Sequence, residues 1–208
     1  MSEATAPRSW TGTVRAAISR DLPIENLLPE RQSYYVGSWV YVFGVVTIAA
    51  LAWVIISGVV LTFMGPQWWH DSGLGHFVNS VHFWSVQVFF IFMVLHLWGQ
   101  YFGAGWRDGR APTWMIGAVI LLVSIVAAFT GYLSQQNFDA QWIAINAKDA
   151  VNSIGVGSFF DVMNFGQMYG LHVMLIPIAI VALVGLHIVQ VRMRGVVRPI
   201  EHPEESRS

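Results

Sequence analysis

The amino-acid sequence predicts an all-α membrane protein, a bundle of four transmembrane helices. Of its 208 residues, 55% are hydrophobic and only 11% are charged, whereas ~25% of the residues in an ordinary soluble domain are charged. Four apolar stretches each reach the ~20 residues that a helix needs to cross the hydrocarbon core. None of the four contains Lys, Arg, Asp or Glu. A net charge of −1 excludes the basic surface that nucleic-acid binding requires.

The four spans are predicted from the limits of the apolar stretches. They run from about Ser38 to Met64, Phe77 to Gln100, Thr113 to Leu133 and Met168 to Val191. The first connection, Gly65 to His76, is short. The connection of about 34 residues from Ser134 to Gln167 is long for a helical bundle, which indicates a functional or folded segment.

Within the long connection, Phe138 to Val151 fits two interpretations equally well. It forms either a surface helix with Trp142 and Ile145 toward the membrane, or a simple linker. In the N-terminal segment, residues 13–28 are a candidate for a second stretch along the membrane surface, although Pro23 interrupts them. No cleavable signal peptide is apparent, so the mature protein is expected to start near Met1.

The basic residues predict the orientation of the bundle. Four spans place both termini on one side, together with the connection between the second and third spans. That side carries ten of the eleven basic residues, and the other side carries only Lys148. The positive-inside rule therefore predicts an integral plasma-membrane protein with both termini in the cytoplasm.

Four histidines lie inside the predicted spans, where ionisable groups are costly and therefore mark functional sites. His82 and His96 are 14 residues apart on the second span, which places them ~21 Å apart on nearly one face. His172 and His187 are 15 residues apart on the fourth span, or ~22 Å. Antiparallel helices would bring them together as an outer pair, His82 with His172, and an inner pair, His96 with His187.

Two facing imidazoles are the ligand set of a haem iron, because the porphyrin supplies the other four nitrogens. A zinc ion would need further carboxylate or thiol ligands, which these spans lack. The chain has no cysteine, so disulfides, iron–sulfur ligation and thioether-linked haem are all excluded. The prediction is two non-covalent haem b groups, each carrying one electron. The extra residue on the fourth span must be absorbed by tilt or by a local irregularity, for which Pro177 is a cause.

Glycines repeat the 14-residue interval on the other two spans. Gly44 and Gly58 lie on the first, and Gly117 and Gly131 on the third. Each is expected at the height of one haem, where a missing side chain lets the backbone approach the ring. Small residues also occur in ordinary packing of membrane helices, which is the alternative explanation.

The stretches SVHFW…VLHLW, TWMIG…FTGY and YGLHVMLIP…GLH resemble the N-terminal four-helix part of cytochrome b from quinol:cytochrome c and plastocyanin oxidoreductases. The 15-residue interval resembles the short, split form, cytochrome b6. The resemblance implies a low-potential outer haem, a high-potential inner haem and quinone as substrate. It also implies that Trp114 lies near the inner haem and Arg192 at the inner quinone pocket. The corresponding division is 1–37 as cytoplasmic segment, 38–191 as dihaem cytochrome b domain and 192–208 as cytoplasmic tail.

The chain departs from the family where arginines usually accompany the haems and where a Pro-Trp-Asp run usually follows the third span. The residues at these places are Asn79, Phe83 and Gly99, and Ser134 to Asn137. Haem propionates would then need hydrogen bonds, water or partner chains in place of the cations. In the family, the Pro-Trp-Asp run helps to form the outer quinol pocket.

The leading functional hypothesis is an electron-transfer subunit of a membrane quinol oxidoreductase, rather than a complete enzyme. Its expected partners are membrane lipid, a subunit carrying the rest of cytochrome b, a Rieske-type iron–sulfur protein and a c-type cytochrome. A second hypothesis is a dihaem membrane anchor that connects a peripheral dehydrogenase or hydrogenase to quinone. A third is a haem-free transporter or assembly factor with structural histidines.

Overall fold

The computed structural model describes Trp10 and residues 34–197. Within this part, four helical segments are long and apolar enough to cross a membrane, as predicted. They are α3 (Trp39–Met64), α5 (Gly73–Phe102), α6 (Ala111–Leu133) and the segment Phe165–Arg194. The predicted surface stretch at 13–28 lies outside the described residues.

The fourth span is made of three pieces. It begins with α8 (Phe165–Gly170), continues through the π-helical segment η2 (Leu171–Leu175) and ends with α9 (Ile176–Arg194). A π-helical turn contains one residue more than an α-helical turn, so η2 takes up an extra residue within this span. The predicted local irregularity is therefore confirmed, and Pro177 lies two residues after the end of η2.

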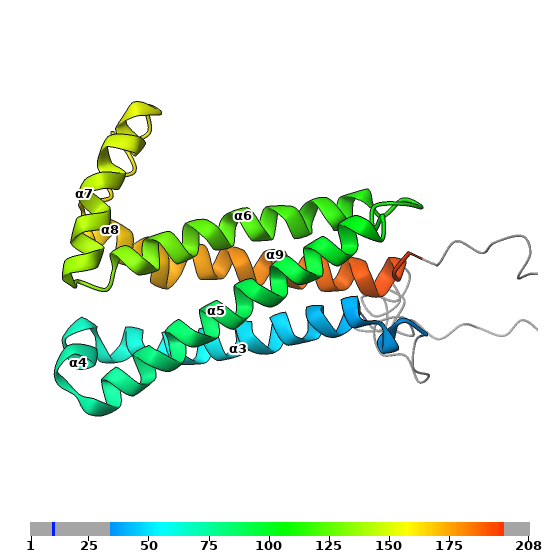
Figure 1. Ribbon diagram of the computed structural model, residues 1–208, viewed down its shortest axis with the longest axis horizontal. Coiled ribbons are helices and arrows are strands. Elements are labelled where there is room, and N and C mark those ends of the chain that lie inside the picture. The colour runs from blue at the N-terminus through cyan, green and yellow to red at the C-terminus, as the bar shows by residue number, and fades with distance from the viewer. Residues whose placement is uncertain (1–9, 11–33, 198–208) are drawn as a thin grey trace, which may run out of the picture.

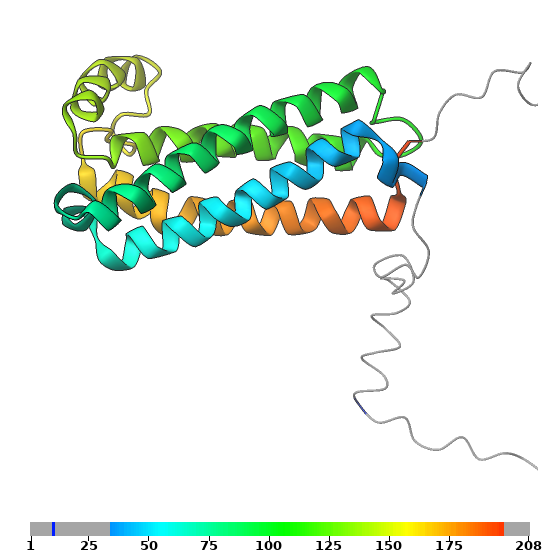
Figure 2. The same cartoon turned by 60° about the horizontal axis from the view of Figure 1, so that its bottom comes forward.

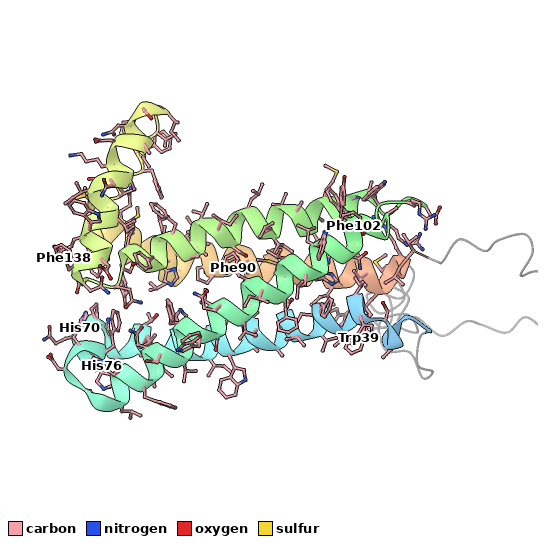
Figure 3. All side chains as sticks on the ribbon, viewed as in Figure 1. Trp39, His70, His76, Phe90, Phe102 and Phe138 are labelled. Atoms are coloured by element: carbon pink, nitrogen blue, oxygen red, sulfur yellow. The ribbon has the colours of Figure 1, made fainter. Side chains whose placement is uncertain are left out.

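The helices form two antiparallel pairs, α3 with α5 and α6 with α9, that lie side by side along the bundle (Figures 1 and 2). Helix η1 (Tyr34–Gly37) and the C-terminal end of α9 lie at one end of the bundle, together with the α5–α6 connection. Following the charge pattern, we call this end the inner end and the opposite one the outer end. Figure 3 labels His70 and His76 at the outer end and Trp39 at the inner end.

Local sequence explains how the spans begin and end. Gly65 ends α3 with φ of 78°, a left-handed conformation that a side chain disfavours. Pro66 then starts α4 (Pro66–Asp71), a short helix within the connection expected to be a loop. The Ser72 side chain caps α5 by accepting a hydrogen bond from the Gly75 N–H, so α5 begins four residues before the predicted start at Phe77.

The long connection contains a helix, α7 (Phe138–Ser153), so the helical interpretation is confirmed and the simple linker is wrong. The Asn137 side chain caps it by accepting a hydrogen bond from the Ala140 N–H at 2.8 Å. Ala140 and Ala144 are buried against the outer end of the bundle, whereas Trp142 is 59% exposed. In Figure 1, α7 projects sideways from this end.

The core of the bundle lies midway between the two histidine heights. Phe89 is seven residues from both His82 and His96, and Leu51 is seven residues from both Gly44 and Gly58. The buried cluster there consists of Ala50, Leu51, Phe89, Met93, Ile120, Ile176 and Ile180. The outward faces are also apolar, with Phe63 86% exposed and Leu122 63% exposed. An apolar exterior of this extent suits a hydrocarbon environment rather than water.

Candidate haem site

Each of the four histidines lies against one glycine of a neighbouring helix. The imidazoles of His82 and His96, both on α5, contact Gly58 and Gly44 of α3. The imidazoles of His172 and His187, on the fourth span, contact Gly131 and Gly117 of α6 in the same way. The structure therefore brings all eight residues together as two outer and two inner histidine–glycine contacts.

These contacts are tight at three of the four glycines. A Cβ at Gly44 would lie 3.0 Å from Cε1 of His96, and one at Gly58 would lie 3.1 Å from Cε1 of His82. At Gly131 it would lie 2.8 Å from Nδ1 of His172. Only at Gly117 is the nearest ring atom, Cε1 of His187, at an ordinary contact distance of 3.4 Å. At Gly44, Gly58 and Gly131, glycine is thus required sterically for the ring to lie against the neighbouring backbone.

Three of the histidines are anchored by a repeated hydrogen bond. Nδ1 of His96 lies 2.8 Å from the carbonyl of Val40, Nδ1 of His172 lies 2.9 Å from that of Ala127, and Nδ1 of His187 lies 3.1 Å from that of Thr113. Each of these carbonyls belongs to the residue four positions before the contacting glycine. A carbonyl only accepts, so Nδ1 of a neutral imidazole carries the proton and Nε2 keeps its lone pair for a ligand bond.

His82 is anchored differently, by the side chain of Ser57. The Ser57 hydroxyl donates to the carbonyl of Trp53 at 2.6 Å, and its oxygen lies 3.0 Å from Nδ1 of His82. Because the hydroxyl proton is used toward Trp53, the oxygen accepts from Nδ1–H of His82. The result is the same tautomer as at the other three positions.

The outer pair has a separation that suits a metal ion between two imidazoles. The ring centroids of His82 and His172 are 6.2 Å apart, and the rings are perpendicular. Half of this separation matches the distance from a metal ion to the centre of a coordinated imidazole, which is a metal–nitrogen bond of ~2.0 Å plus roughly the radius of the ring. In the described residues no group of three or more His, Cys, Asp or Glu could hold a bare metal ion. The donor set therefore fits a macrocycle that brings its own four nitrogens.

The inner end offers hydrogen-bonding groups that a haem propionate or another polar ligand could use. The buried atoms Thr113 Oγ1, Trp114 Nε1 and Gln190 Oε1 have no hydrogen-bond partner in the described part of the chain. The carbonyl of Thr113 already holds His187, and Gln190 follows His187 by about one helical turn. Buried polar groups are normally paired, so these atoms indicate a ligand at this end.

The two remaining predicted residues differ in their placement. The Trp114 ring contacts that of Trp106 with centroids 5.7 Å apart, at the start of α6. Arg192 lies in the last turn of α9, partly buried. Both lie at the inner end of the bundle.

Three contacts at the outer end were not anticipated from the sequence. Asn79 and Gln135 form a reciprocal amide pair, with Asn79 Nδ2 to Gln135 Oε1 at 3.2 Å and Gln135 Nε2 to Asn79 Oδ1 at 3.5 Å. The Gln135 carbonyl also accepts from Nε2 of His70 at 3.0 Å. The third contact is that of Ser57 with His82. Ser57 lies directly before Gly58, just as Thr130 lies directly before Gly131. That repeated hydroxyl–glycine pair was a usable signal in the sequence.

Comparison with known proteins agrees with the geometry. A family model described as cytochrome b(N-terminal)/b6/petB matches residues 87–207. Cytochrome b6 of Heliomicrobium gestii is 26% identical over 142 residues, which cover 63% of this chain and 67% of the relative. The cytochrome b subunit of a menaquinol:cytochrome c reductase from Geobacillus thermodenitrificans is 22% identical over 191 residues, covering 81% and 85%.

A solved structure titled hyperthermophilic respiratory Complex III has a similar fold, with a TM-score of 0.68 at 23% identity. The match covers 93% of this chain but only 56% of that chain, so this chain spans little more than half of it. The family model covers more than half of this chain, including His96, His172 and His187 but not His82. The protein is therefore an integral, multi-pass membrane protein of the cytochrome b N-terminal/b6 family, and membership in this family implies b-type haem.

Proposed function

We propose that the protein is the dihaem cytochrome b subunit of a membrane quinol oxidoreductase, which moves electrons across the bilayer between quinone sites. The observation that carries the proposal is the set of four anchored histidines. Each Nδ1 is committed to a hydrogen bond with a neighbouring helix, which leaves each Nε2 free. The relatives named as cytochrome b6 and as a menaquinol:cytochrome c reductase subunit support the assignment.

In this proposal His82 and His172 ligate the outer haem, and His96 and His187 ligate the inner one. Held by two imidazoles each, both haems would supply one-electron chemistry only, because no site for a further ligand would remain. The residues of the chain have three tasks: to hold each imidazole in one tautomer, to leave space for the ring at the four glycines, and to keep water out. The apolar layer around Phe89 and Leu51 separates the two heights and performs the last task.

The quinone sites are proposed at the two ends. At the inner end, Arg192 offers a cation and Trp114 a buried N–H that has no partner in the described structure. At the outer end, the neutral Asn79–Gln135 pair stands where the family usually has charged or Pro-Trp-Asp residues. A subunit carrying the rest of cytochrome b would complete the outer pocket, and a Rieske-type protein and a c-type cytochrome would accept electrons there.

The experiment is purification of the chain with its native partners, followed by haem quantification and a reduced-minus-oxidised spectrum. Two non-covalent b haems per chain, together with a Rieske-type subunit, are expected. Two haems with a peripheral dehydrogenase or hydrogenase would instead identify a membrane anchor. A preparation without b-type absorption would overturn the proposal and favour a haem-free protein with structural histidines.

A further inference from the structure

The outer and inner histidine pairs differ in one respect that the haem spacing does not require. At the outer height, the residue before each contacting glycine carries a hydroxyl, Ser57 on α3 and Thr130 on α6. At the inner height, the equivalent residues are Phe43 and Ile116, which have none. Both hydroxyl residues are almost fully buried, with Ser57 4% and Thr130 0% exposed.

Both hydroxyls act on the hydrogen bond that anchors a histidine. Thr130 Oγ1 shares its proton between the carbonyls of Val126 at 2.9 Å and Ala127 at 3.0 Å, and Ala127 is the carbonyl that accepts from His172. The Ala127 oxygen also accepts the helical N–H four residues later, so three donors share it. Sharing one oxygen among more donors weakens each bond, because a carbonyl has only two lone pairs.

On α3 the effect is more direct, because the Ser57 oxygen itself accepts from Nδ1 of His82 at 3.0 Å, in addition to the backbone carbonyl of Val54. The Ser57 oxygen also lies 3.2 Å from the carbonyl of Val54, although its proton is directed to Trp53, and Val54 lies four residues before Gly58. By the pattern of the other three sites, Val54 is the carbonyl that anchors His82. The Ser57 oxygen therefore competes with this backbone acceptor for the Nδ1 proton of His82.

The inner histidines donate to carbonyls without such competition among the described contacts. His96 donates to Val40 and His187 to Thr113, and each carbonyl has only its helical N–H besides. A stronger bond from Nδ1–H makes the imidazole a more basic ligand, which favours the oxidised metal. The outer imidazoles are therefore the less basic pair.

We propose that Ser57 and Thr130 are positioning residues that orient the outer histidine pair and raise the reduction potential of the haem held between them. This rests on the proposed dihaem function. The two hydroxyls act through His82 and His172, so they change the reduction potential of the outer haem only.

The test uses the purified holoprotein in its complex, with Ser57→Ala and Thr130→Val as the primary variants. The midpoint potential of each haem is measured by redox titration, and the ferric low-spin signal by electron paramagnetic resonance. That signal depends on the angle between the two axial imidazole planes, so it reports a rotated ring. In each variant, the ratio of oxidised to reduced outer haem at a given potential is expected to rise by up to about tenfold. This corresponds to a midpoint potential that is lower by ~59 mV for one electron. The midpoint potential of the inner haem is expected to stay unchanged.

Matched controls separate this effect from general packing. Thr47→Val on α3 removes a hydroxyl that donates to the carbonyl of Phe43, which anchors no histidine in the described structure, and both potentials should stay unchanged. Ser57→Thr keeps the hydroxyl and should restore the normal potential and signal. Because a buried methyl group can disturb packing, Thr130→Ala is measured beside Thr130→Val, and both must shift the outer potential in the same direction.

The outcomes distinguish this inference from the proposed function. A wild-type protein without two bis-histidine haem signals would overturn the dihaem function itself. Two normal haems in the wild type, with unchanged outer potential and spectrum in Ser57→Ala and Thr130→Val, would overturn only the role of the hydroxyls. An equal shift of both haems, or opposite shifts in the two Thr130 variants, would also overturn it.

Discussion

Gly131 lies directly against the imidazole of His172, so closely that a Cβ on this glycine would stand 2.8 Å from Nδ1 of the ring. Real Cβ atoms almost never approach another atom so closely, and the ring would have to move. Its counterpart on the same helix, Gly117, leaves 3.4 Å to His187. The two glycines of α6 therefore differ in how much they tolerate a side chain.

The first prediction concerns these glycines. Gly131→Ala is expected to displace His172 and to lose most of the outer haem, because overpacking a tight site costs ~1–3 kcal/mol. Gly117→Ala should keep most of the inner haem. The measurement is the haem-to-protein ratio of each purified variant. Gly185→Ala, where a Cβ meets nothing within 4 Å, is the control and should bind both haems. Equal haem loss in the two α6 variants would contradict the steric argument.

The second prediction concerns the ligand pairs. Replacing His82 or His172 by Leu should remove one haem, and replacing His96 or His187 should remove the other, because a haem held by one axial ligand binds weakly. The difference spectrum of each variant identifies the haem that remains. Acidified acetone should extract all the haem from the wild type, since the chain has no cysteine. If the His82 and His187 variants lost the same haem, the assigned pairing would be wrong.

The third prediction concerns the amide pair at the outer end. In a double-mutant cycle, Asn79→Ala and Gln135→Ala should show a coupling energy of ~0.5–1.5 kcal/mol, the usual contribution of a hydrogen bond. The amide pair joins α5 to the turn after α6, so its loss should loosen the contact between the two helical pairs. Thermal unfolding of the four proteins of the cycle, followed by haem absorbance, measures the coupling energy. The exposed Gln67–Asp71 pair within α4 is the control, with a smaller coupling expected. Zero coupling at Asn79 would show that the amides act independently.

The fourth prediction concerns topology. A reporter fused after Arg198 should be active only on the cytoplasmic side, because ten of the eleven basic residues lie with the termini. A reporter inserted after Ser153, at the end of α7, should be active only on the opposite side. The pair of fusions serves as its own control, and activity of both on one side would refute a four-span topology.

The fifth prediction concerns quinone at the inner end. Arg192→Ala should weaken quinone binding by about tenfold, the effect of losing one hydrogen bond to a charged donor. Re-oxidation of the inner haem by added quinone measures this, over a range of quinone concentrations. Arg194→Ala is the matched control, because Arg194 is exposed at the end of the same helix. An unchanged rate and affinity in the Arg192 variant would remove this residue from the site.

Much of the fold and of the candidate site follows from the sequence alone. Hydrophobic length predicts the four spans because every residue in a bilayer core must be apolar or paired, and this constraint acts locally. The spacing of His82 from His96, and of Gly44 from Gly58, predicts shared heights because helical rise and rotation are fixed. Helix α5 nevertheless extends beyond its predicted limits, since the cap at Ser72 lies outside the apolar stretch.

Other features were decided only by the tertiary structure. Whether 138–151 forms a helix depended on burying Ala140 and Ala144 against the end of the bundle, which no local pattern contains. The partnership of Asn79 with Gln135, and of Ser57 with His82, joins residues far apart in the chain. Such hydrogen bonds depend on how two helices are placed against each other, and residue spacing within one helix carries no information on that placement. The sequence by itself determined which residues share a height, and packing between helices decided which atoms anchor each histidine.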